Sequence, residues 1–187
     1  GQSFYFKING VPVFLKGYDW IPSDCFSPWM TRERYEDLLE SAALANCNTL
    51  RVWGGGLYEH DAFYELCDEK GILVWQDFMF ACGMYPWDDG FLANVAVEAT
   101  HQLRRLARHP SLLLWCGNNE CETSLDWFQE TKANRERFAA GYHRLYLDTL
   151  GRLVRRECPD LPFWPSSPCN GPEEHPVKPM TRKRAAK

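Results

Sequence analysis

The sequence predicts an α/β fold, a partial (β/α)8 or TIM barrel of about the first five βα units, on three observations. Short apolar runs alternate along the chain with longer segments of helical periodicity. These runs are nearly continuous in apolar residues, as in parallel strands that are covered on both faces. No glycine-rich phosphate turn follows the first run, so a barrel is favoured over an open doubly wound sheet. A complete barrel needs about 250 residues, so a chain of 187 residues fits only part of one.

The first predicted strand is VFLKGYDW, residues 13–20, and a helix follows it. Thr31 is a suitable N-cap, because its hydroxyl can accept a hydrogen bond from the first helical turn. An apolar stripe from Tyr35 to Ala45 then recurs at helical spacing. This stretch therefore reads as the first βα unit.

The second predicted strand is NTLRVWG, residues 48–54, and its helix carries Phe63, Leu66 and Cys67 on one face. Gly71 can end that helix, because glycine adopts the left-handed conformation without steric cost.

The third strand is ILVWQDF, residues 72–78, and its helix spans the stripe from Val95 to Leu106. The His109-Pro110 pair stops this helix, since proline disfavours helical conformation in the residue before it.

The fourth strand is LLLWCGN, residues 112–118, followed by a helix from Phe138 to Leu153 and by a fifth strand, PFWPSS, at 162–167. The order is strand and helix in strict alternation, which predicts a parallel sheet with right-handed crossovers. We assign residues 1–171 to the N-terminal part of a barrel domain. Residues 172–187 form a basic tail that we expect to be disordered or unrelated to the domain.

Composition excludes several classes of function. The chain is 45% hydrophobic and 25% charged, and it contains no apolar stretch long enough to span a bilayer, so no membrane partner is expected. The net charge is −4, and five basic residues after Glu174 leave −9 on the rest, which argues against nucleic acid as a partner. The chain begins GQSFYFKING, without a recognisable leader, so no localisation is predicted.

Cysteine and histidine spacing predicts neither a metal site nor a cofactor. The eight cysteines contain no CxxC pair, and the five histidines show no HxH or HExxH spacing. Five of the cysteines lie in or beside apolar segments, where buried free thiols are expected: Cys47, Cys67, Cys82, Cys116 and Cys121.

Polar residues follow each predicted strand at its C-terminal end. In a (β/α) barrel these ends share one mouth, where binding and catalytic sites are built. Tryptophan faces, amides, carboxylates and an arginine suit a neutral polyhydroxylated ligand, so carbohydrate is the expected substrate. The residues at the five ends are Asp19 and Trp20; Arg51 and Trp53; Gln76 and Asp77; Asn118, Asn119 and Glu120; and Ser166 and Ser167.

Glu120 is the candidate general acid. It follows the apolar segment LLLW, and partial desolvation there favours a protonated carboxyl near neutral pH. The alternative is a carboxylate that stabilises a helix N-terminus. The three glycines at 54–56 lack phosphate-loop spacing, and we expect them to let the backbone pass Trp53 and hold its ring in the mouth.

Four segments together resemble the catalytic barrel of β-mannosidases of glycoside hydrolase family 2. They are FYFKINGVPVFLKGYDWIPSD, NTLRVWGGGLYE, FYELCDEKGILVWQDFMFACGMYP and HPSLLLWCGNNE, and the resemblance extends from residue 3 to about residue 171. It implies retaining exo-hydrolysis of terminal β-D-mannose from β-mannosides and oligosaccharides, without a cofactor. It also implies further barrel strands and flanking β-sandwich domains in a full-length parent.

The resemblance assigns roles residue by residue. Glu120 matches the general acid/base, and Asn119 matches the residue that binds the substrate 2-hydroxyl. Arg51, Trp53 and Asp77 match positions that line the mannose subsite. Two further substrate-binding positions are Trp127, which matches a tryptophan after the acid/base, and Asp19, which stands where many relatives have Asn.

A retaining mechanism needs a second carboxylate as nucleophile, and in this family it comes from the seventh strand. The chain ends before that strand, so we expect a fragment that is inactive alone. Neither Asp77 nor Glu122 matches the nucleophile. Two alternatives remain: another family 2 glycosidase (a β-galactosidase, β-glucuronidase or exo-glucosaminidase), or a non-catalytic carbohydrate-binding fragment.

Overall fold

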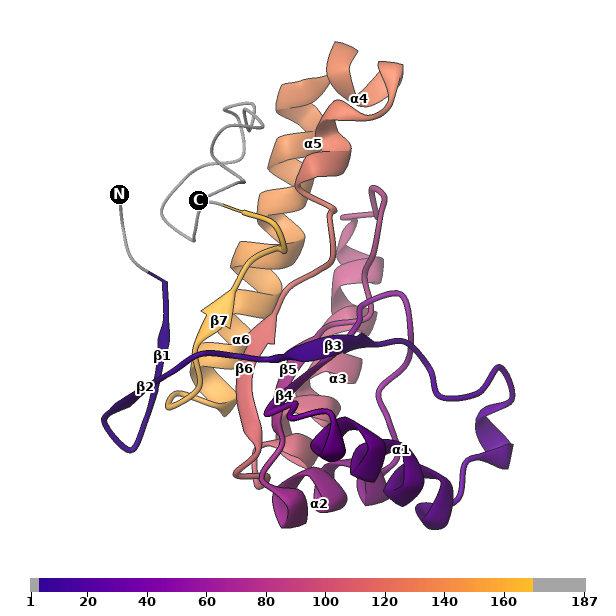
Figure 1. The fold of residues 1–187 in the computed structure, drawn as a ribbon. Coiled ribbons are helices and arrows are strands. Elements are labelled where there is room, and N and C mark those ends of the chain that lie inside the picture. The colour runs from indigo at the N-terminus through magenta and orange to yellow at the C-terminus, as the bar shows by residue number, and fades with distance from the viewer. Residues whose placement is uncertain (1–3, 170–187) are drawn as a thin grey trace.

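The computed structural model describes residues 4–169, and its centre is a five-stranded parallel sheet (Figure 1). The strands lie side by side in chain order, which confirms the α/β class and the predicted parallel sheet. They are shorter than predicted: β3 (Gly17–Trp20), β4 (Thr49–Val52), β5 (Leu73–Asp77), β6 (Leu112–Cys116) and β7 (Phe163–Trp164).

The helices alternate with the strands and pack against one face of the sheet (Figure 1). The main ones are α1 (Arg32–Leu44), α2 (Asp61–Lys70) and α3 (Asp89–Leu106); short turns η1 (Ser27–Trp29), η2 (Thr123–Asp126) and α4 (Gln129–Ala133) lie in the connections. The predicted fourth helix is an unbroken run of α5 (Arg135–Tyr142), the π-helical η3 (His143–Leu150) and α6 (Gly151–Glu157).

The predicted helix ends are confirmed. The Thr31 hydroxyl accepts a hydrogen bond from the Arg34 amide, and Gly71 has the left-handed conformation with φ 69°. The third helix ends at Leu106, before the His109-Pro110 pair.

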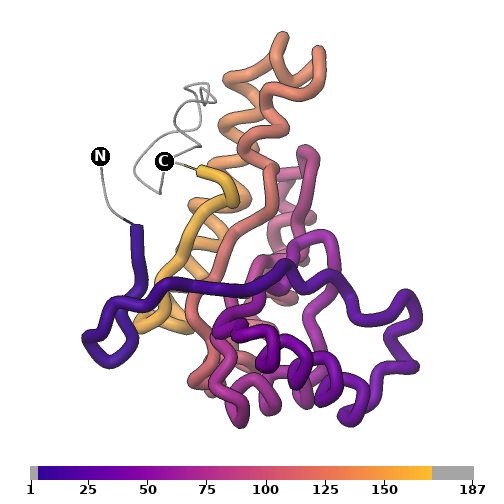
Figure 2. The backbone as a smooth tube through the Cα atoms, in the orientation of Figure 1, coloured from indigo at the N-terminus to yellow at the C-terminus, as the bar shows by residue number. Residues whose placement is uncertain are grey.

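One prediction about the N-terminal strand is wrong. Residues 13–20 do not form a single strand, because Val13 belongs to an antiparallel hairpin of β1 (Phe6–Ile8) and β2 (Val11–Val13). The hairpin turns at Asn9 and Gly10, whose φ angles are 50° and 81°, as in the tight turns that suit hairpin twist. From it the chain crosses to β3 at the far edge of the sheet (Figure 2).

The two faces of the sheet carry different sets of side chains, because successive side chains of a strand point to opposite faces. One face belongs to the main core with the helices and includes Leu50, Val52, Val74 and Trp115. The opposite face carries Leu114, Cys116, Trp75 and Trp164, and the hairpin covers it through Phe6 and Ile8. The strand ends of this hairpin-covered face carry the polar residues described below.

The thiol prediction is correct in part. Cys67, Cys116 and Cys121 are buried free thiols. Cys47 is only half-buried and Cys82 is exposed, because Cys82 lies in the loop beyond β5 rather than in an apolar element.

Within residues 4–169, no helix has the length and apolar character needed to cross a membrane. The same residues contain no group of three or more His, Cys, Asp or Glu side chains arranged to hold a metal ion. The predicted domain boundary at residue 171 and the tail at 172–187 lie outside the described residues.

Candidate active site

Arg51 on β4 joins the ends of four adjacent strands. Its Nη2 atom donates to Asp77 Oδ2 on β5 at 2.8 Å and to Asn119 Oδ1 beyond β6 at 2.9 Å. Its Nη1 atom lies 3.4 Å from Asp19 Oδ1 on β3. Four residues that the sequence placed on separate strands therefore form one polar cluster at the C-terminal end of the sheet.

Asp77 is the buried anchor of this cluster. Its side chain is 0% exposed, and it accepts hydrogen bonds from Arg51, Trp75 Nε1 at 2.9 Å and the Gly54 amide at 3.1 Å. Burial raises the pKa of Asp77, whereas the Arg51 guanidinium and the other donors favour its ionised form. Because each carboxylate oxygen already has a partner, Asp77 serves to hold Arg51 and the start of the glycine segment in place.

Two of the predicted strand-end residues face the helices instead of the mouth. Trp20 donates from Nε1 to Glu59 at 3.0 Å and packs on Phe63 of α2. Gln76 is fully buried and accepts a hydrogen bond from the Tyr64 hydroxyl of α2 at 2.7 Å. Strand alternation explains both, because the neighbours Asp19 and Asp77 occupy the opposite face.

Asn118 and Ser166 fix the turn that carries Glu120, a role that the sequence did not reveal. Asn118 is fully buried; its amide donates to Pro165 O at 2.9 Å, and its Oδ1 accepts from Ser166 Oγ at 2.6 Å and from the Cys121 amide at 2.9 Å. The only sequence signal was the polarity of both residues at strand ends.

Glu120 itself stands in an unusual backbone conformation. Its φ angle is 60°, in the left-handed region that non-glycine residues seldom adopt and that often marks a functional position. The Glu120 amide donates to Ser167 O at 3.0 Å, and the Glu120 carbonyl accepts from the Ser124 amide at 2.9 Å. The half-buried carboxyl group is therefore presented from a fixed turn rather than from a mobile loop.

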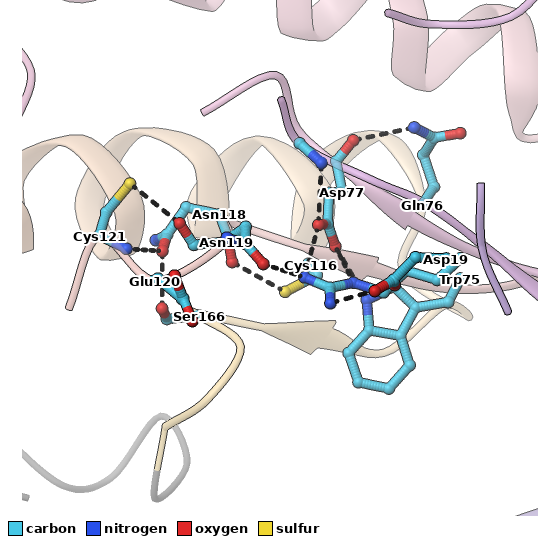
Figure 3. Close-up of polar contacts among 12 residues, drawn as sticks. Asp19, Trp75, Gln76, Asp77, Cys116, Asn118, Asn119, Glu120, Cys121 and Ser166 are labelled. Atoms are coloured by element: carbon cyan, nitrogen blue, oxygen red, sulfur yellow. Dashed lines mark hydrogen bonds and ion pairs between the residues drawn. The ribbon is translucent and has the colours of Figure 1, made fainter. Parts of the chain in front are cut away.

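Asn119 lies directly beside Glu120 with both ends of its amide occupied (Figure 3). Oδ1 accepts from Arg51, and Nδ2 donates to Cys82 Sγ at 3.3 Å. Sheet-like pairing continues on both sides, to Ala81 and to Ser167. The orientation of the Asn119 amide is therefore set by its neighbours.

Trp53 lies over Gly55, as predicted from the glycine segment. A Cβ atom on Gly55 would stand 2.0 Å from the Trp53 ring, so no other residue fits there without displacing the indole. Gly54 contributes differently, through the amide that binds Asp77.

Trp127 and Glu122 follow the acid/base turn. Trp127 is 44% exposed, and its ring contacts Phe128 rather than the core. The Glu122 carboxylate accepts from the Tyr142 hydroxyl of α5 at 3.4 Å, so it points toward the helix, as expected. Trp127 thus remains a candidate binding residue on structural grounds, and Glu122 is engaged elsewhere.

Chemically, the cluster combines a partly exposed carboxyl group with fixed amide, guanidinium and carboxylate groups. Such a set can bind several hydroxyl groups and exchange a proton with a bound oxygen atom.

Comparisons with known proteins give a consistent set of relatives, although no protein-family model matches the chain. The β-mannosidase of Mus musculus is 52% identical over 173 residues, which is 91% of this chain and 20% of the relative. A probable β-mannosidase of Caenorhabditis elegans is 42% identical over 92% of this chain and 19% of its own length. The chain thus spans about a fifth of the length of the curated relatives it matches.

Comparison with solved structures gives relatives of the same kind. The β-D-mannosidase from Dictyoglomus thermophilum matches 92% of this chain and 21% of its own chain, with a TM-score of 0.80 and 47% identity. A β-glucuronidase from Bacteroides uniformis matches 83% of this chain and 18% of its own, with a TM-score of 0.67 and 23% identity, a likeness of fold alone. The resemblance to β-mannosidases of glycoside hydrolase family 2 is thereby confirmed.

Proposed function

We propose that this chain carries the acid/base half of the active site of a β-mannosidase. The parent enzyme is a retaining, exo-acting glycosidase that releases terminal β-D-mannose from β-mannosides and oligosaccharides. The observation that carries the proposal is the single cluster in which Arg51 joins Asp19, Asp77 and Asn119, with Glu120 next to it. Relatives named β-mannosidase at 50–52% identity support the choice of mannose.

In this mechanism Glu120 protonates the departing oxygen and later removes a proton from water. Asn119 binds the 2-hydroxyl of the sugar, an interaction that strengthens in the transition state. Arg51 and Asp19 bind further hydroxyl groups, Asp77 holds Arg51 in place for this, and Trp53 and Trp127 offer aromatic faces to the sugar ring.

The nucleophile of a retaining mechanism lies about 5 to 5.5 Å from the acid/base. We place it outside residues 4–169, because Asp77 is committed to Arg51 and Glu122 to Tyr142. The fold supports a partial barrel of five βα units: β3 and β7 form the two edges of the described sheet, and Tyr18 on β3 is 61% exposed. Further strands and flanking β-sandwich domains would complete the site in the parent.

The test compares two proteins. The 187-residue chain alone should show no hydrolysis of an aryl β-mannoside, since among residues 4–169 neither Asp77 nor Glu122 is available as the nucleophile. A longer protein that adds the remaining barrel strands and flanking domains, called the extended protein below, should hydrolyse it. Turnover by the short chain would contradict the missing-nucleophile argument. An extended protein that prefers a galactoside, glucuronide or glucosaminide would contradict the mannose assignment, and one that binds mannosides without hydrolysing them would indicate a non-catalytic module.

Replacing Gly55 by Ala should reduce kcat/KM of the extended protein about 10- to 100-fold, because a small displacement of a substrate-positioning group is costly. The added methyl would occupy the space of the Trp53 ring. Gly83→Ala is the matched control: its nearest neighbour would be 3.9 Å from the new Cβ, so kcat/KM should stay near the unsubstituted value. Equal effects of the two substitutions on kcat/KM would show that Trp53 does not line the mannose subsite.

A further inference from the structure

Cys82 occupies a position equivalent to that of Glu120, one strand away. It follows β5 as Glu120 follows β6, and its φ angle of 56° is likewise in the left-handed region. The Cys82 amide donates to Asn119 O at 2.8 Å, which ties the two loops together. Two neighbouring loops therefore each place a non-glycine residue in a strained conformation at the same end of the sheet.

The Cys82 side chain contacts both residues to which we assign proton transfer and 2-hydroxyl binding. Its Sγ atom accepts from Asn119 Nδ2 at 3.3 Å and lies 3.6 Å from Glu120 Oε2, within range of an S–H donor. A thiol can accept and donate in this way at the same time. The hydrogen-bonded path thus runs from Asp77 through Arg51 and Asn119 to Cys82 and Glu120.

We propose that Cys82 is a positioning residue for the acid/base, whose thiol orients the Asn119 amide and donates a hydrogen bond to the ionised Glu120 carboxylate. The proposal rests on the function assigned to Glu120 above. It adds a contact from a neighbouring strand that acts on the reaction through the Glu120 carboxyl group.

The surroundings keep the thiol in its donor form. Partial desolvation raises the pKa of the Cys82 thiol, as does the neighbouring Glu120 carboxylate, while Asn119 lowers it; the net direction is upward. The protonated thiol is therefore retained at neutral pH. Among residues 4–169, the other titratable groups that face this pair are Tyr85 and Cys121, with Arg51 and Asp77 beyond Asn119.

Removing the thiol should weaken catalysis, because the Asn119 amide would lose its acceptor and the Glu120 carboxylate would lose a donor. In the extended protein, Cys82→Ala should lower kcat/KM about 3- to 10-fold, as expected for the loss of weak hydrogen bonds. Cys82→Ser keeps both a donor and an acceptor and should restore most of the lost activity. An unchanged kcat/KM in the alanine variant, or equal losses in both variants, would overturn the proposal.

A second measurement needs no catalysis. Because the Glu120 carboxylate raises the pKa of the thiol, Glu120→Gln should accelerate alkylation of Cys82 by iodoacetamide about threefold near pH 8, where the rate follows the thiolate fraction. Peptide mass spectrometry can separate Cys82 from the exposed Cys25, which serves as the internal reference. An unchanged ratio would refute the contact even if the glycosidase assignment holds. Conversely, an active Glu120→Gln enzyme would refute the assigned function while the alkylation ratio reports the contact alone.

Discussion

Replacing Glu120 by Gln in the extended protein should reduce hydrolysis of β-mannosides with poor leaving groups by about 10²- to 10⁴-fold, the usual contribution of a general acid/base. Glutamine has nearly the same shape but cannot transfer a proton, so the turn held by Asn118 and Ser166 should be preserved. Steady-state kinetics on a natural oligosaccharide would measure the loss. Unaltered thermal stability would show that the loss is chemical.

Glu122→Gln is the matched control, since Glu122 lies two residues away and its carboxylate accepts a hydrogen bond from Tyr142 of α5. It should leave kcat/KM nearly unchanged. Leaving-group chemistry gives a second readout: Glu120→Ala should impair activated aryl glycosides much less than oligosaccharides, because an activated phenolate departs without strong protonation. Equal losses on both substrates would argue against the acid role.

The sequence predicted the elements well because the information it used was local. Helix caps and stops depend on a few neighbouring residues, and Thr31 and Gly71 act as predicted. The hairpin was missed although Asn9 and Gly10 were a visible signal. The apolar run continues from Val11 through Val13 to Phe14 and Leu15, so composition alone did not separate β2 from β3.

The site was predicted less completely, because it depends on which face of the sheet each side chain occupies and on contacts between residues far apart in the sequence. Adjacent residues at a strand end point to opposite faces, so only one of Asp19 and Trp20 can enter the mouth, and only register shows which. Asn118 binds Pro165 and Ser166 across 47 and 48 residues of sequence. No local pattern encodes such a contact, and the same holds for the path from Cys82 to Glu120.

The Arg51–Asp77 pair has a consequence for stability as well as for binding. The Arg51 side chain is 19% exposed and that of Asp77 is 0% exposed. Removing one partner of such a pair leaves a buried charge uncompensated, which costs about 3 kcal/mol or more. Arg51→Met should therefore lower the thermal stability of the barrel in the extended protein markedly, whereas Arg32→Met, which breaks exposed pairs with Glu65 and Glu69, should leave Tm nearly unchanged.

The pH dependence of Tm in the Arg51→Met variant should identify Asp77 as the cause of the lost stability. Burial raises the pKa of Asp77 and Arg51 opposes this, so the Arg51→Met substitution should raise it further. The unfolded chain loses the Asp proton near pH 4, while the folded variant keeps it to higher pH. Between those two values the unfolded state binds fewer protons, so the variant should lose stability as pH rises, and its Tm should be higher at pH 5 than at pH 7. Adding Asp77→Asn removes the titrating group and should restore part of the lost stability at pH 7, since one of the two donors, Trp75 Nε1 or the Gly54 amide, can still bond to the amide oxygen. If the Tm of the Arg51→Met variant does not depend on pH in this range, Asp77 is not the charge that Arg51 compensates.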